Sequence, residues 1–137
     1  MFSRKEIFFI VALVLLPVIP AAFISRGIEV KETNVKNDPF RKKISEISDD
    51  VIWIDARDQK KYDQKHIPGA VLIDAKYWEE GLAKLFEVFE PGKTIVVYCN
   101  AGCSSSSSVA ERLRKELGQE NIYYLHGGMD SWFSKEQ

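Results

Sequence analysis

The stretch from Thr94 to Leu113 reads TIVVYCNAGCSSSSSVAERL, and it decides the fold. It opens with an unbroken apolar run over 95–98, which is typical of a strand buried on both faces. Small residues follow over 99–105, the segment called here the Cys99 loop, and apolar residues then recur at helical spacing from Val109. This order places the Cys99 thiol at the amino end of a helix. Because free backbone N–H groups and the helix dipole favour a thiolate there, the sequence predicts a nucleophile at Cys99.

The same alternation of strands and helices continues on both sides of this stretch. Other apolar runs of strand length lie before and after it. Together with the run at 95–98, they predict four strands, at 51–54, 71–73, 95–98 and 122–125. Predicted helices begin at Asp38-Pro39, with Ile44 and Ile47 on its apolar edge, at 58–65, after Asp74, after the Cys99 loop, and at Gly127-Gly128. Strands that alternate with helices predict an α/β fold with a central parallel sheet flanked by helices. In such sheets the active site lies beyond the carboxyl ends of the strands, where Cys99 stands.

Composition excludes several other classes of protein. The 137 residues suffice for one domain, and the net charge of −1 gives no basic surface for nucleic acid. Two cysteines are too few for a disulfide scaffold, and both lie in the Cys99 loop. The two histidines and two cysteines lack the paired spacing of a zinc site, so we expect neither a metal nor another cofactor.

The amino terminus differs in character from the rest of the chain. Residues 7–24 are 18 residues without a charge, close to the shortest length that spans a membrane. We therefore expect a membrane anchor at 1–26, a polar linker at 27–37 and the folded domain at 38–137. The short amino-terminal tail favours a domain on the periplasmic or extracytoplasmic side. Secretion after cleavage of a signal peptide is the alternative.

Four segments together resemble the rhodanese family. They are Ile54-Asp55-Ala56-Arg57, His66-Ile67-Pro68-Gly69-Ala70, Val97-Tyr98-Cys99 with Gly102 and Ser105 behind it, and Leu125-His126-Gly127-Gly128 with Trp132. The resemblance implies a rhodanese-like fold, a central parallel sheet between helices, over about residues 38–133. It also implies sulfurtransferase activity, in which Cys99 carries a sulfane sulfur as a persulfide.

The resemblance and the residue chemistry together name the candidate site. Cys99 is the expected catalytic residue. A cradle of N–H groups and hydroxyls is expected to bind an anionic substrate, and its members are Asn100, Ala101, Gly102, Cys103, Ser104 and Ser105. Asp55 and Arg57 are expected to form an ion pair that shapes the rim of the site or supports it. His66 is placed with them in a supporting, hydrogen-bonding role.

Two residues of the Cys99 loop depart from the family pattern and leave alternatives open. Many active rhodaneses carry an arginine at the position of Ser104, and serine supplies no charge for an anionic donor such as thiosulfate. Cys103 adds a second thiol, which could act as a resolving thiol for Cys99. The expected partners are therefore a small sulfur donor or a persulfide-carrying protein, together with a thiol acceptor. The alternatives are a thiol–disulfide redox module that uses Cys99 and Cys103, and a non-catalytic rhodanese-like binding domain.

Overall fold

The computed structural model describes residues 37–137. The anchor predicted at 1–26 and nearly all of the predicted linker lie outside the described residues. Among the helices of residues 37–137, none combines the length and the apolar character that a membrane span needs.

A five-stranded parallel sheet forms the centre of the domain. Its strands are β1 (Arg41–Lys42), β2 (Ile52–Asp55), β3 (Val71–Leu72), β4 (Ile95–Tyr98) and β5 (Ile122–Leu125), in the order β1-β5-β4-β2-β3. All four residues of β4 are buried, as its unbroken apolar run predicted. The prediction of an α/β fold built on a parallel sheet is confirmed.

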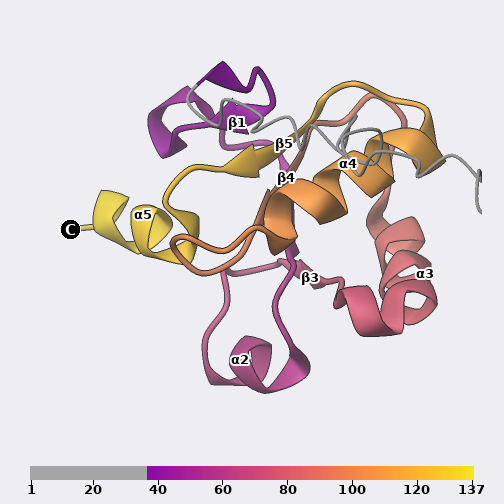
Figure 1. Cartoon of the computed structure of the whole chain (residues 1–137), viewed down its shortest axis with the longest axis horizontal. Helices are drawn as coiled ribbons and strands as arrows, with labels where there is room; N and C mark the ends of the chain where they lie inside the picture. The colour runs from indigo at the N-terminus through magenta and orange to yellow at the C-terminus, as the bar shows by residue number, and fades with distance from the viewer. Residues whose placement is uncertain (1–36) are drawn as a thin grey trace, which may run out of the picture. The chain divides into compact units, whose positions relative to one another are not determined.

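Helices cover both faces of this sheet. They are α2 (Gln59–Gln64), α3 (Trp78–Val88), α4 (Ser105–Leu117) and α5 (Gly128–Lys135), with short 3₁₀ turns at η3 (Ile44–Glu46) and η4 (Ala75–Tyr77). Side chains alternate along β4, so that Ile95 and Val97 pack with α3 and α4 whereas Val96 and Tyr98 pack toward α5. Figure 1 shows α3 and α4 on one side of the strands and α5 on the other.

The prediction of a helix that begins at Asp38 is wrong. The Asp38 carboxylate accepts a hydrogen bond from the Phe40 backbone N–H at 2.9 Å and closes a turn, after which the chain pairs with β5 as β1. The Phe40 carbonyl accepts from the Tyr124 N–H at 2.9 Å. Pairing of β1 with β5 thus replaces the predicted helix, of which only the short 3₁₀ turn η3 forms. Ile44 and Ile47 still pack against the core.

The helix that follows β4 begins and ends where its sequence predicts. Ser104 stands at its N-cap position without a capping bond from its side chain, and Gly118 ends it in the left-handed conformation at φ 63°. Val109, Ala110 and Leu113 anchor its inner face in the core. Helix α4 therefore fixes the far end of the Cys99 loop, and β4 fixes the near end.

Candidate active site

Cys99 follows directly on the buried end of β4. Cys99 is 1% exposed, whereas the other six residues of the Cys99 loop, 100–105, are all exposed. The loop leaves the carboxyl edge of the sheet and enters α4 at Ser105. The predicted loop residues therefore surround a thiol that lies beneath them.

The Cys99 thiol faces oxygen acceptors. Its Sγ lies 3.3 Å from each of the backbone carbonyl oxygens of Asn100 and Cys103 and 3.5 Å from the Ser106 hydroxyl, so its single S–H proton has three alternative acceptors. Burial raises the pKa of the Cys99 thiol, although the Ser106 hydroxyl and backbone N–H act against this rise. The donors at the start of the helix act to lower the pKa of Cys99, in the direction predicted from the sequence, but the loss of water outweighs them in this resting thiol.

Two of the backbone N–H groups that were expected to bind an anion form hydrogen bonds within the loop itself. The Cys103 N–H donates to the Asn100 carbonyl at 3.2 Å, and the Ser105 N–H donates to the Cys103 Sγ at 3.4 Å. Gly102 adopts φ 74°, a conformation that favours glycine, and so allows the tight turn of the loop. Binding of an anion by the remaining N–H groups stays a prediction.

Cys103 differs from Cys99 in its surroundings. It is exposed, and both cysteines are free. Partial burial acts to raise the pKa of Cys103, but hydrogen bonds from the Cys99 thiol and from Ser105 lower it overall. The pair thus combines a buried thiol of raised pKa with an exposed thiol of lowered pKa.

Ser106 is a site residue that sequence reasoning missed. It belongs to a run of five serines, Ser104 to Ser108, of which only Ser104 and Ser105 were predicted to belong to the site. Ser106 is only 3% exposed, and its hydroxyl accepts from the Cys99 thiol. Its position in the first turn of α4, three residues before the buried Val109, was too weak a signal to distinguish it from the neighbouring serines.

Gly128 packs against the backbone of the Cys99 loop, and sequence reasoning also failed to identify it as a site residue. A Cβ built on Gly128 overlaps the Cys99 carbonyl and lies 2.7 Å from the Asn100 carbonyl carbon and 2.8 Å from the Ala101 nitrogen. The next N–H, that of Met129, donates to the Cys99 carbonyl at 2.8 Å. The start of α5 thus packs directly on the backbone of the Cys99 loop, with no room for a side chain.

Replacing Gly128 with alanine is expected to destabilise the domain by about 2–3 kcal/mol, because φ 62° strains an L-residue and the new Cβ displaces the loop backbone. Urea unfolding measures this cost. Gly69→Ala is the matched control, since Gly69 has φ 77° but open space around its Cβ position. Equal losses for the two variants would contradict the packing role of Gly128.

A buried ion pair lies beside the end of β4, the strand that Cys99 follows. Arg57 Nη2 lies 2.6 Å from Asp55 Oδ2, with side-chain exposures of 5% and 0%. The Tyr98 hydroxyl donates to the same carboxylate oxygen at 2.8 Å, and Arg57 Nη2 also donates to the Lys65 carbonyl at 2.6 Å. The hydrogen bond to Asp55 raises the pKa of Arg57. The predicted ion pair is present, and it braces β2, β4 and the segment after α2 from within.

His66 lies in the same segment and contacts Tyr62. Its Nδ1 is 2.8 Å from the Tyr62 carbonyl, and its ring stacks on the Tyr62 ring with centroids 3.9 Å apart. The Tyr62 hydroxyl in turn donates to the Ala70 carbonyl at 2.7 Å. These contacts hold the 66–70 turn against α2.

The arrangement of a nucleophile loop between a buried parallel strand and a helix agrees with a comparison of family models. Residues 36–135 match the model of the rhodanese-like domain. The chain belongs to the rhodanese-like domain family. The resemblance carried by the four sequence segments is thereby confirmed.

Relatives of this rhodanese-like domain include named sulfurtransferases. The thiosulfate sulfurtransferase GlpE of Coxiella burnetii is 37% identical over 86 residues, which cover 61% of this chain and 72% of the relative. The thiosulfate sulfurtransferase PspE of Escherichia coli is 36% identical over 78 residues, covering 57% and 71%. The solution structure of protein hp1203 from Helicobacter pylori superposes with a TM-score of 0.54 at 27% identity, covering 69% and 83%.

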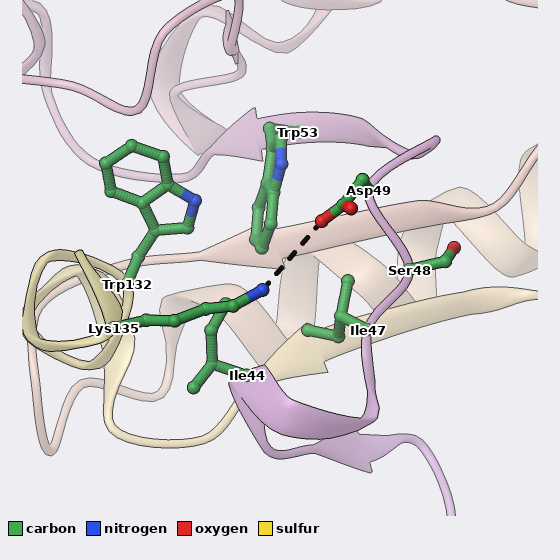
Figure 2. A pocket seen from close by; sticks show the side chains of 7 residues that line it. All are labelled: Ile44, Ile47, Ser48, Asp49, Trp53, Trp132 and Lys135. Carbon is green, nitrogen blue, oxygen red and sulfur yellow. Dashed lines mark ion pairs between the residues drawn. The ribbon is translucent and has the colours of Figure 1, made fainter.

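A separate pocket of this rhodanese-like domain lies on the α5 side of the sheet. It has a volume of about 170 Å³ and is lined by Ile44, Ile47, Ser48, Asp49, Trp53, Trp132 and Lys135. Figure 2 shows Lys135 reaching from α5 toward Asp49, with 3.8 Å between Nζ and Oδ1. Its lining includes no residue of the Cys99 loop, so the pocket is not the mouth of the thiol site. Within residues 37–137, no three His, Cys, Asp or Glu residues gather as a metal site.

Proposed function

We propose that this protein is a sulfurtransferase that carries a sulfane sulfur as a persulfide on Cys99. It takes the sulfur from thiosulfate or a persulfide and passes it to a thiophilic acceptor such as cyanide or a thiol. The observation that carries the proposal is the position of Cys99, at the end of a buried parallel strand and under a loop of small residues, in a rhodanese-like domain. The names of the relatives GlpE and PspE support the same reaction class.

Two displacements at sulfur make up the proposed cycle. The Cys99 thiolate attacks the outer sulfur of the donor, a new S–S bond forms, and the donor leaves with the electron pair as sulfite or a thiolate. The acceptor then attacks the outer sulfur of the persulfide, and Cys99 leaves as a thiolate. Each step exchanges one bond to sulfur for another, so the cycle needs no external oxidant or reductant. The Ser106 hydroxyl and N–H are placed to stabilise the Cys99 thiolate in both steps.

The charges around the loop favour a persulfide over thiosulfate as the donor. Residues 99–105 include no lysine or arginine, and the guanidinium of Arg57 is bound to Asp55 and the Lys65 carbonyl. A dianion that enters this loop therefore meets backbone N–H groups and hydroxyls, and residues 99–105 supply no cation to it. The reacting group of a persulfide donor carries at most one negative charge, whereas thiosulfate carries two, so a persulfide depends less on such a cation.

Mass spectrometry of the loaded protein tests this proposal. The full chain is incubated with thiosulfate and, separately, with glutathione persulfide, and the Cys99 peptide is examined for one added sulfur atom. Transfer from the loaded protein to cyanide and to glutathione is then followed. We expect loading at Cys99 from both donors and faster loading from the persulfide. Absence of loading and transfer with both donors would leave the non-catalytic binding domain as the better account.

We also propose that residues 7–24 tether the domain to a membrane, with the domain on the extracytoplasmic side. The uncharged run of 18 residues supports this placement. Secretion after signal cleavage would instead release a shortened chain. Fractionation of cells that express the full chain separates the two, because a tethered protein stays with the membranes at full length.

A further inference from the structure

The two thiols of the Cys99 loop differ in the size of molecule that can reach them. Cys99 is 1% exposed and lies beneath the loop, whereas Cys103 is exposed in the same loop, four residues later. A small linear molecule needs only a brief opening of the loop to reach Cys99. A cysteine on a folded partner protein needs a clear approach to the attacked sulfur, and Cys103 offers this approach.

The two cysteines also lie next to each other. The Cys99 Sγ lies 3.3 Å from the Cys103 carbonyl oxygen. The pKa of Cys99 is raised, chiefly by burial and also by the neighbouring Cys103 thiol, whereas the Cys99 thiol acts to lower the pKa of Cys103. The Ser105 N–H donates to the Cys103 Sγ at 3.4 Å, which further favours a thiolate at Cys103. The exposed thiol is therefore both the accessible one and the one more readily deprotonated.

We propose that Cys103 is a second sulfur-carrying residue, through which the buried Cys99 exchanges sulfane sulfur with the thiols of partner proteins. This inference rests on the proposed sulfurtransferase function and names its partner class as protein thiols or protein persulfides. Cys99 holds the sulfur away from solvent, and Cys103 receives or delivers it at the surface.

The internal step balances without a further reactant. The Cys103 thiolate attacks the outer sulfur of the Cys99 persulfide, a bond forms between this sulfur and Cys103 Sγ, and its bond to Cys99 Sγ breaks. Cys99 leaves as a thiolate, which takes the proton when the pair returns to rest. Loading from a protein persulfide follows the same step in reverse.

The test compares a small and a bulky acceptor for the full chain and its Cys103→Ser variant. Both proteins are loaded with glutathione persulfide and then discharged to cyanide or to a folded protein that carries one surface cysteine. For Cys103→Ser we expect the ratio of transfer to the protein thiol over transfer to cyanide to fall by about tenfold or more, because the buried persulfide is then the only one. In the natural chain, peptide mapping is expected to find the added sulfur on both cysteines.

Two further variants separate the thiol from the loop structure. Cys103→Ser keeps an acceptor for the Ser105 N–H and Cys103→Ala removes it, so equal losses assign the effect to the missing sulfur. Ser108→Ala changes an exposed serine of α4 and is expected to leave both transfers unchanged.

Three outcomes would overturn the inference, and they point to different accounts. Undiminished transfer from Cys103→Ser to the protein thiol would show that Cys99 serves bulky acceptors directly. A Cys99–Cys103 disulfide formed with release of sulfide would assign Cys103 as a resolving thiol. Failure of the natural chain to load Cys99 at all would instead reject the proposed function itself.

Discussion

Replacing Cys99 with serine is expected to lower sulfur transfer to small acceptors by a factor on the order of a thousand or more, because a serine hydroxyl is a far weaker nucleophile than a thiolate and forms no persulfide. The measurement is steady-state transfer from glutathione persulfide to cyanide. Exposed Cys103 remains in this variant, so any residual transfer reports what the surface thiol achieves alone. Activity equal to that of the natural chain would remove Cys99 from the mechanism.

The serine variant is expected to keep the fold, which makes its loss of activity interpretable. A serine hydroxyl can donate to the same carbonyls of Asn100 and Cys103 that accept from the thiol. The change in the free energy of unfolding is expected to stay within about 1 kcal/mol. Urea unfolding checks this, and a larger loss would assign part of the effect to the structure of the loop.

Replacing Asp55 with alanine is expected to cost about 3–5 kcal/mol of folding free energy, because it leaves the buried Arg57 guanidinium without its counter-charge. The Tyr98 hydroxyl loses its acceptor in the same change. Urea or thermal unfolding measures the loss. Since Tyr98 directly precedes Cys99, the variant is also expected to lose transfer activity at temperatures where it remains folded.

A second substitution separates the lost pair from the lost volume. In Asp55→Ala combined with Arg57→Met, no uncompensated charge remains, and most of the stability is expected to return. Glu111→Ala is the surface control, because it breaks the exposed Lys115–Glu111 ion pair and is expected to leave the stability almost unchanged. A double variant as unstable as Asp55→Ala would mean that packing, not charge, explains the loss.

The sequence predicted those elements whose apolar pattern is strong and local. The runs at 95–98 and 122–125 became β4 and β5, and the Cys99 loop stands where it was expected. The two-residue β1 escaped prediction because its charged residues carry no apolar signal, and its place is decided by pairing with β5. Edge strands of this length are defined by their neighbours.

Features of the site that depend on distant contacts also escaped prediction. The raised pKa of Cys99 follows from burial, which the helix-end argument does not include. The Gly127-Gly128 pair was interpreted as the start of a helix, but the lack of a side chain at Gly128 matters to the backbone of residues 99–101. Such a contact joins segments nearly 30 positions apart, and neither segment alone reveals it.

The contact of Gly128 and Met129 with the Cys99 carbonyl has a consequence for synthesis on the ribosome. Strands β2, β3 and β4 are made well before residues 128–129. The nascent chain therefore contains Cys99 before it contains the backbone that packs against the Cys99 loop. Strand β1 likewise waits for β5, which is made more than 75 residues later. Because such long-range contacts form late, we expect a nascent chain to become competent in sulfur chemistry only after α5 has emerged. Until then its cysteines are open to whatever oxidants the compartment contains.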